Sequence, residues 1–464
     1  MKISSKSFSN KHSSSFRDPS GYVFLDNKVL KRVVLPKYFT QYHALKKSGF
    51  YQKAMQHGLL IPHTESKSEK DSIELIPEEI PFISYPYEWS FNQLKDAALH
   101  TLKLQKYAVN NGFVLKDASA FNIAFHHGKT IFIDTLSFDF YTQDSPWKAF
   151  KMFVQHFLSP LVLAYYHGAS ILKLLQTHID GIPLSLTSSL LPWKSKLSPM
   201  IYTNIHLLAK AELKYINQTG KKFNEVKVKK ERHLNHLDAL YSFIQGLKIN
   251  QQTEWGNYYD NIHYNDTSLT FKKNQISEWV SYLGVKTVVD VGGNDGTMVR
   301  SFHNNLDFAI VGDIDENAVD LNYQKIKEQM GSNIIPLLLD ILQPTPALGF
   351  NSKERFSIIK RLSKLNPDLT LALALVHHIS LSGNVPFLKT AEFFARFSNY
   401  LIIEFPNRDD DMVQLLLNQK RDFKNHFDFY SVENFEKDFG VFFEIKKRVP
   451  IPKSNRILYQ MEIK

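Results

Sequence analysis

The segment VVDVGGNDGT at residues 288–297 constrains the fold of this chain more than any other stretch. Its apolar residues are typical of a buried strand, and two consecutive glycines and then the start of a helix follow. Glycine lets the backbone turn tightly and approach a ligand closely. The segment therefore predicts a strand, turn and helix in an open α/β sheet, with a ligand site at the carboxyl end of the strand.

From about residue 262 onward, strand-like segments alternate with helical ones. This alternation predicts a mostly parallel sheet with helices on both faces. No long helix separates the last two strands, so we expect them to pair as an antiparallel hairpin at the edge of the sheet. The expected strands are residues 286–291, 308–313, 333–339, 368–376, 399–405, 441–448 and 456–463.

An acidic residue ends each of the first three predicted strands. Asp290, ahead of the glycines, is suited to orient an ammonium group, directly or through water. Asp313 is suited to accept hydrogen bonds from both hydroxyls of a ribose, although Asp315 competes for this role. Asp340 is placed to meet the amino group of an adenine. Together these acids describe a ligand that has an ammonium group, a ribose and an adenine.

The glycine pattern differs from the fingerprint of a nicotinamide dinucleotide site. That fingerprint requires Gly-x-Gly-x-x-Gly, with a pyrophosphate at the helix N-terminus. Here Asn294 replaces the second glycine and Thr297 replaces the third. A carboxylate ahead of the glycines would also repel a phosphate.

Residues 262–464 thus resemble the class I S-adenosylmethionine-dependent methyltransferases. The resemblance implies a Rossmann-like α/β domain with seven strands, one of them antiparallel, and S-adenosylmethionine as the cofactor. It assigns Asp313 to the ribose and Asp340 to the adenine. The residues that it assigns to the loop around the methionine part are Asp290, Gly292, Gly293, Asn294 and Gly296.

The histidine pair His377-His378 follows the fourth predicted strand. Methyl transfer to a hydroxyl or an amine needs alignment and a proton acceptor, and the ordinary pKa of histidine suits that role. Many small-molecule methyltransferases resemble this Leu-x-His-His-Ile pattern. We name both as catalytic candidates and favour His377, which comes first after the strand; the alternative is that the pair only shapes the site.

Two further acidic features have structural interpretations. Glu404 ends the fifth predicted strand, and we expect it to cap a loop rather than face the ligand site. The run Asp409–Asp411 fits a solvated loop or a helix N-terminus better than a metal cluster. The chain has no cysteine, which excludes disulfides, thiolate zinc sites and a cysteine nucleophile. Apart from the N-terminal residues considered below, the sequence therefore predicts no metal site.

Charge divides the chain into two halves. Residues 1–250 hold 32 Lys and Arg against 19 Asp and Glu, a net charge of +13, and the remainder carries −3. We therefore predict one domain over residues 21–250 and a second over residues 251–464, and we expect the serine-rich residues 1–20 to form a flexible tail. A basic domain suits an anionic partner, although solvated lysine faces explain the charge equally well.

The N-terminal half contains Asp117, Asn122 five residues later, and Asp134 at a strand end. This spacing resembles the catalytic core of the protein-kinase-like α+β fold, in which such residues position a hydroxyl and hold magnesium on ATP. Lys28 or Lys31 could be the accompanying strand lysine, and residues 64–80 look like a polar loop. Because Leu-Lys-Asp replaces His-Arg-Asp and Asp-Thr-Leu replaces Asp-Phe-Gly, the domain resembles a degenerate kinase.

The whole chain from about residue 15 is also similar to the bacterial nodulation-protein-like methyltransferases, a family of two-part chains. The matching stretches include SFRDPSG at 15–21, SYPYEWS at 84–90 and IFIDTLSF at 131–138. This similarity implies a small-molecule, glycan or lipid-type acceptor that the N-terminal domain binds or presents. Two alternatives remain: an RNA methyltransferase that grips nucleic acid with the basic run 221–232, and a bifunctional protein that also binds ATP.

No segment reads as a membrane span, because the most apolar stretch, residues 157–171, is interrupted by Pro160 and His167. The serine-rich N-terminus lacks the apolar core of a signal peptide. We therefore expect a cytoplasmic protein.

Overall fold

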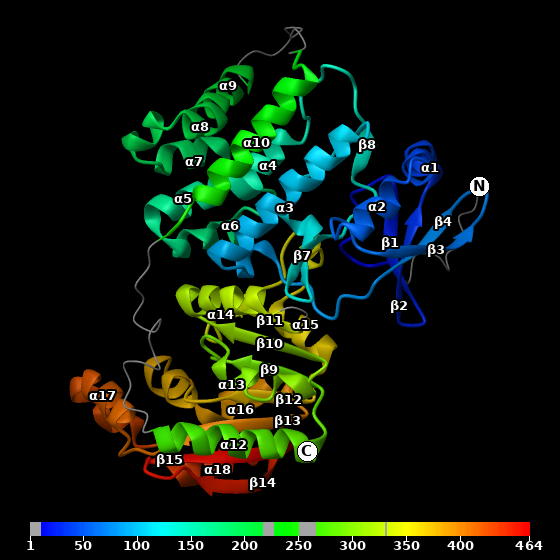
Figure 1. Cartoon of the computed structure of the whole chain (residues 1–464). Helices are drawn as coiled ribbons and strands as arrows, with labels where there is room; N and C mark the ends of the chain where they lie inside the picture. The colour runs from blue at the N-terminus through cyan, green and yellow to red at the C-terminus, as the bar shows by residue number, and fades with distance from the viewer. Residues whose placement is uncertain (1–10, 217–226, 250–265, 330–331) are drawn as a thin grey trace. The chain divides into compact units, whose positions relative to one another are not determined.

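The computed structural model describes residues 11–216, 227–249, 266–329 and 332–464. The chain divides into two compact units (Figure 1). The first comprises residues 1–250 together with the short segment Leu348–Arg355, and the second comprises residues 251–347 and 356–464. Among the described residues, no helix combines the length and the apolar character needed to cross a membrane.

The first unit begins with a four-stranded antiparallel sheet in the order β1-β2-β4-β3. Asn27 and Lys28 form the two-residue turn between β1 and β2, both with positive φ, as favoured hairpin turns require. The strands are β1 (Gly21–Asp26), β2 (Val29–Val34), β3 (His63–Ser68) and β4 (Ile73–Pro77).

The prediction of a loop over residues 64–80 was wrong, because this stretch holds most of β3 and all of β4. The side chains of β3 are largely exposed at the edge of the sheet, so its sequence shows no apolar alternation. In β4, Ile73 and Leu75 are buried and supply the apolar face of the hairpin.

The longest helix of the first unit is α3 (Phe91–Asn110). Ser90 caps it by accepting a hydrogen bond from Gln93, whose side chain bonds back to Ser90. Two small antiparallel pairs follow, β5 (Phe113–Leu115) with β8 (Phe138–Phe140) and β6 (Ile123–His126) with β7 (Lys129–Phe132). The other helices are α1 (Phe39–Lys47), α2 (Phe50–Gln56), α4 (Phe150–Phe153), α5 (Ser159–His167), α6 (Leu174–Thr177), α7 (Leu184–Leu190), α8 (Pro199–Ile201), α9 (Leu207–Ile216) and α10 (Lys230–Gly246).

The second unit is built on a seven-stranded sheet in the order β11-β10-β9-β12-β13-β15-β14 (Figure 1). The first five strands of this order are parallel, and β15 is antiparallel to both of its neighbours. This is the mixed α/β architecture predicted from the sequence. The strands are β9 (Thr287–Val291), β10 (Phe308–Asp313), β11 (Ile334–Leu338), β12 (Leu369–Ala372), β13 (Tyr400–Pro406), β14 (Phe443–Pro450) and β15 (Arg456–Ile463).

Two details of the sheet differ from or refine the predictions. The fourth strand ends at Ala372 and not at residue 376, because Ala374 takes a left-handed conformation with φ of 49° and starts a turn. The last two strands do pair as an antiparallel hairpin, as predicted. Of these two strands, however, only β14 lies at an edge of the sheet, since β15 pairs with both β13 and β14.

Helices pack on the sheet through a buried apolar cluster. Ile276 and Trp279 on α12 contact a core that includes Val288, Leu371 and Ile402 from three neighbouring strands. This packing holds the carboxyl ends of β9, β10, β11 and β12 along one edge of the sheet. The helices are α12 (Asp266–Leu283), α13 (Thr297–Arg300), α14 (Glu316–Glu328), α15 (Ile358–Leu365), α16 (Phe387–Ala395), α17 (Asp411–Gln419) and α18 (Val432–Phe439).

Candidate functional site

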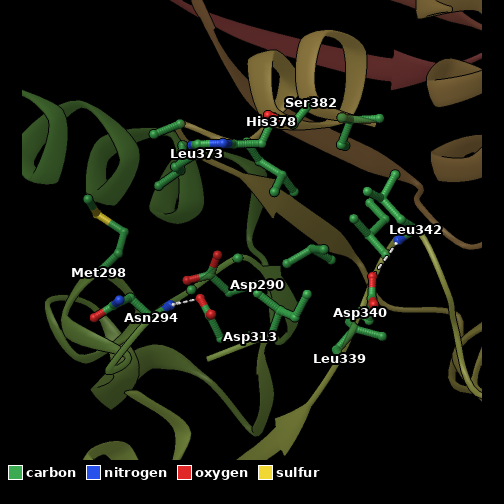
Figure 2. Close-up of a pocket in the computed structure, with 18 of the residues that line it drawn as sticks. Asp290, Asn294, Met298, Asp313, Leu339, Asp340, Leu342, Leu373, His378 and Ser382 are labelled. Atoms are coloured by element: carbon green, nitrogen blue, oxygen red, sulfur yellow. Dashed lines mark hydrogen bonds between the residues drawn. The ribbon is translucent and has the colours of Figure 1, made fainter. Parts of the chain in front are cut away.

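A pocket of about 280 Å³ lies at the carboxyl ends of the parallel strands of the second unit (Figure 2). This is where ligands bind in open α/β sheets, at the point where the strand order reverses. Its lining comes from the segments that follow β9, β10, β11 and β12, from helices α12 and α13, and from the helical turn at residues 378–382. The lining residues are Lys272, Asp290, Val291, Gly292, Gly293, Asn294, Met298, Asp313, Ile314, Leu339, Asp340, Ile341, Leu342, Leu373, Ala374, Leu375, His378, Ile379 and Ser382.

The loop after β9 forms one wall of the pocket. The backbone N–H groups of Gly292 and Gly293 both donate to the carbonyl oxygen of Gly312, which folds the loop back over β10. Gly292 and Asn294 have φ of 75° and 48°, and Gly296, which does not line the pocket, has φ of 76°. Left-handed φ explains why glycine and asparagine occur here. A Cβ on Gly293 would lie 2.7 Å from the Asp290 carboxylate.

Asp290 is a buried acid without a hydrogen-bond partner among the described residues. Its side chain is on the pocket lining, and neither carboxylate oxygen accepts a hydrogen bond. Burial raises the pKa of Asp290 to about 7; nearby Asp313 adds to this effect, and Lys272 opposes it. A buried polar group without a partner is unfavourable. The position is therefore built to receive a hydrogen-bond donor or a cation from a ligand.

Asp313 is also buried, but its carboxylate is held in place. It accepts hydrogen bonds from the backbone N–H of Asn294 at 2.8 Å and of Asp315 at 2.9 Å. Burial raises the pKa of Asp313 to about 6, although these hydrogen bonds lower it. The alternative acid, Asp315, does not line the pocket: it caps α14 by accepting from the N–H groups of Asn317 and Ala318.

Asp340 lies at the far end of the same pocket (Figure 2). Its Oδ1 atom accepts from the N–H groups of Leu342 at 2.9 Å and Gln343 at 3.1 Å, which fixes the direction of the carboxylate. Around it the lining is apolar, with Ile314 and Leu342 each about half exposed to the pocket and the solvent. A flat, weakly polar ring fits between such side chains.

The two histidines differ in their position relative to the pocket. His378 lines the pocket, whereas His377 is 1 % exposed and lies outside the lining. The geometry therefore favours His378 over the preferred His377: because β12 ends early, a turn intervenes, and successive residues in the following helical turn point in different directions. Burial lowers the pKa of His378, and nearby Arg456 lowers it further, which favours the neutral, proton-accepting form.

A buried charge network that sequence reasoning missed reaches the pocket through Lys272. Its ammonium group is 2.8 Å from Oε2 of Glu404, whose other oxygen is 3.0 Å from Arg456. Burial alone would raise the pKa of Glu404, but the two cations hold it at about 2. Arg456 also binds Asp410, which caps α17. Glu404 thus belongs to an ion network and does not cap a loop, whereas the helix N-terminus expected at residues 409–411 is confirmed.

In the first unit, Asp117, Asn122 and Asp134 come from the segments around β6 and β7. Asp134 is engaged by the guanidinium of Arg32 and by the hydroxyl of Ser137. Burial alone would raise the pKa of Asp134, but Arg32 and Ser137 outweigh it, so the carboxyl stays ionised. Asp117 accepts from the N–H of Ser119, and burial raises its pKa.

The basic strand residue that reaches Asp134 is therefore Arg32, and neither of the two predicted lysines. Lys28 lies in the turn between β1 and β2, and Lys31 pairs with Asp26 and Glu74. Residues 221–226 of the predicted nucleic-acid-binding run lie outside the described part of the chain.

No protein-family model matches the chain. The chain is 29% identical over 461 residues to the nodulation protein NoeA of Rhizobium meliloti (strain 1021), covering 97% of this chain and 95% of NoeA.

Solved structures similar to part of the chain include two named methyltransferases. The N-methyltransferase NodS from Bradyrhizobium japonicum WM9 has a TM-score of 0.30 at 12% identity, over 43% of this chain and 98% of NodS. A methyltransferase from Aquifex aeolicus, described as SAM-dependent, has a TM-score of 0.31 at 17% identity, over 46% of this chain and 100% of its own. The whole-length similarity is therefore to NoeA, and the similarity to these solved structures covers less than half of the chain.

Proposed function

We propose that the protein is an S-adenosylmethionine-dependent methyltransferase and that the second unit holds the cofactor. One observation carries this proposal: both oxygens of the buried Asp290 carboxylate lack a partner among the described residues and face the pocket. A cofactor with an ammonium group next to a sulfonium supplies the missing donor and the missing positive charge. A phosphate at this point would be repelled, so a dinucleotide fits less well.

The other two acids fit the remaining parts of the same cofactor. Asp313 and Asp340 both line the pocket and are both oriented by backbone N–H groups. We assign Asp313 to the ribose hydroxyls and Asp340 to the adenine amino group, with Ile314 and Leu342 flanking the base. Gly292, Gly293 and Asn294 enclose the methionine part, and Gly296 supports the turn behind them.

The cofactor carries the activated methyl group, and the protein contributes alignment and proton removal. His378 lines the pocket just after the turn that follows β12. In its neutral form it can take a proton from an acceptor hydroxyl or amine. We therefore assign the base role to His378, while the buried His377 supports the turn.

In the first unit a four-stranded sheet precedes α3 and the two small strand pairs, an order that supports the kinase-like interpretation. We propose that it binds or presents the acceptor and does not transfer phosphate, because Arg32 already neutralises Asp134. The net charge of +13 over residues 1–250 suits an anionic acceptor, of a glycan, lipid or other small-molecule type.

Calorimetric titration of the full chain with S-adenosylmethionine tests the cofactor proposal. We expect one equivalent to bind and the Asp290→Ala and Asp313→Ala variants to lose binding. Asp307→Asn is the matched control, because this exposed acid lies at the opposite end of the strand that carries Asp313. The proposal would be wrong if the wild-type protein did not bind S-adenosylmethionine. It would also be wrong if the control variant weakened binding as much as the two test variants do.

The acceptor needs a second experiment. The wild-type chain and the His378→Asn variant are incubated with donor labelled in the methyl group and fractions of a bacterial extract. Label in a glycan, lipid or small-molecule fraction, dependent on His378, is the expected result. Label that appears only in RNA would replace this proposal with a nucleic-acid methyltransferase.

A further inference from the structure

Three side chains that commonly ligate metals gather at an exposed corner of the first unit: Glu78, His126 and His127. Glu78 follows the end of β4, and the histidines stand at the turn that joins β6 to β7. One ligand atom from each lies within 4.8 Å of the others. The proposed methyl transfer uses none of them.

The backbone explains how two consecutive histidines come together. Successive side chains of a strand point to opposite faces, so an ordinary strand would separate them. Here His127 leaves the strand with φ of 49°, and Gly128 follows with φ of 74°. This left-handed turn brings the two imidazole rings to a centroid distance of 3.9 Å. Left-handed φ is uncommon for a residue other than glycine, so the turn is a specific feature of this corner.

The two distances from Glu78 are close to those in a small tetrahedral site. Oε1 of Glu78 is 2.8 Å from Nε2 of His126 and 4.0 Å from Nε2 of His127. Zinc bonds of about 2.0–2.1 Å in tetrahedral geometry separate ligand atoms by about 3.3 Å. The two observed distances lie on either side of that value, and each differs from it by less than about 1 Å.

Exposure shows where a further ligand would enter. The side chain of His126 is 13 % exposed, whereas those of His127 and Glu78 are 55 % and 41 % exposed. The corner is therefore closed on the His126 side and open to solvent on the other. Water can fill the remaining position.

We propose that Glu78, His126 and His127 bind one Zn²⁺ ion, with water as the fourth ligand. Two imidazoles and one carboxylate are a ligand set that zinc takes in proteins. Mg²⁺ and Ca²⁺ prefer shells of oxygen atoms, so they fit this set poorly. The site needs no cysteine and is independent of the methyltransferase function.

The ion would join two parts of the first unit that are distant in sequence. Glu78 belongs to the connection between β4 and α3, and its N–H donates to the carbonyl oxygen of Pro62 at 2.7 Å. The histidines belong to the hairpin that precedes Asp134. Zinc would therefore tie the end of the four-stranded sheet to this hairpin, and it would raise the unfolding temperature because it binds only the folded form.

Titration of the untagged full chain, stripped of metal by a chelator, tests the site. We expect one equivalent of Zn²⁺ to bind by calorimetry, and Co²⁺ at the same site to give the visible absorption of tetrahedral cobalt. Glu78→Gln and His127→Asn should each lower the affinity at least about 10-fold, since even outer-shell changes commonly cost that much. Glu79→Gln is the matched control, because this neighbouring acid is exposed and outside the cluster.

Both test residues are exposed, so the variants should fold, and circular dichroism verifies this. A zinc-dependent rise in unfolding temperature that both variants lose and the control keeps would support the site. The proposal is overturned if one-equivalent binding is absent, if it survives in both variants, or if Glu79→Gln weakens it as much as Glu78→Gln does.

Discussion

The ammonium group of Lys272 lies 2.8 Å from Oε2 of Glu404, and both side chains are buried. Lys272 also lines the pocket beside Asp290, so one lysine belongs both to an internal ion network and to the candidate cofactor site. Removing one member of a buried ion pair is strongly unfavourable, because it leaves the other charge without compensation. The stability of the second unit and the electrostatics of its pocket are therefore coupled through this residue.

Lys272→Met should lower the free energy of unfolding by about 3 kcal/mol, the lower end of the usual range, because Arg456 still compensates Glu404. Chemical denaturation measures this. The double variant Lys272→Met, Glu404→Gln should lose less than the sum of the single variants, because the two groups interact directly. Lys273→Met is the control, with an expected change within about 0.5 kcal/mol. Additive effects in the double variant would contradict the coupling.

The contribution of Asp290 to the stability of the free protein should be lost as the pH rises from about 4 to about 7. Burial raises the pKa of Asp290 to about 7, so over this range the folded protein holds a proton that the unfolded chain has released. Stability from this group is thus fully present below the ordinary pKa of aspartate and is lost as the pH passes 7. Asp290→Asn should remove this contribution, so the difference in unfolding free energy between the variant and the wild type should change by a few kcal/mol between pH 4 and pH 7. Chemical denaturation between pH 4 and pH 8 measures the unfolding free energy of both proteins. The same pH dependence in Asp290→Asn and in the wild type would contradict this prediction.

Cofactor binding should show the opposite dependence on pH. A cationic cofactor needs the ionised form of Asp290, so the affinity for S-adenosylmethionine should increase as the pH rises from 5 toward 7. Binding near pH 6 should release a proton, which calorimetry in buffers of different ionisation enthalpy detects. Binding that is independent of both pH and buffer would show that Asp290 does not face the positive charge.

The two histidines should have different effects when they are replaced. If His378 accepts the proton from the acceptor, His378→Asn should lower kcat by about 10²–10⁴-fold with little loss of stability. His377→Asn should instead lower the melting temperature, because its ring is fully buried. Single-turnover methylation of the acceptor fraction and thermal melting separate these outcomes. Equal kcat losses without destabilisation would assign the chemistry to the pair.

Gly293→Ala should abolish cofactor binding or destabilise the second unit by about 1–3 kcal/mol. An added Cβ would lie 2.7 Å from the Asp290 carboxylate and 2.7 Å from Val311, so the loop would have to move. Gly246→Ala is the matched control, since nothing lies within 4 Å of the Cβ position there. Normal binding by Gly293→Ala would show that the loop adapts.

Magnesium ATP should leave the melting temperature of the chain unchanged. The Arg32 guanidinium occupies the Asp134 carboxylate, which a metal-bound nucleotide would otherwise need. Asp134→Asn should lower stability, since it leaves Arg32 without its partner. Stabilisation by magnesium ATP that disappears in Asp134→Asn would restore the ATP-binding alternative.

Local sequence patterns were enough to predict most of the fold of the second unit and the acidic residues of its pocket. Apolar runs that end in glycine or an acid place Asp290, Asp313 and Asp340 at strand ends, and parallel strands bring such ends to one edge. All three line the same pocket. The alternative ribose acid, Asp315, could not be excluded from sequence, because capping of α14 depends on which N–H groups lie near its side chain.

One prediction failed because of a contact between distant residues, and another because of a local backbone turn. The polar strand β3 has no apolar alternation, and its partner β4 defines it as a strand. The apolar run through residue 376 conceals the end of β12 at Ala372 and the left-handed turn at Ala374, and His378 lines the pocket whereas His377 does not.

The sequence by itself therefore determined the alternating architecture of the second unit and the three acids of its pocket, because strand ends and glycine turns follow from local chemistry. Tertiary structure alone decided the pairing of Lys272 with Glu404 and of Arg32 with Asp134, which are 132 and 102 residues apart. It also brought Glu78 to the two histidines of the β6–β7 turn. Charges are visible in a sequence, but the partner that neutralises a buried charge is set by the packing of the whole unit.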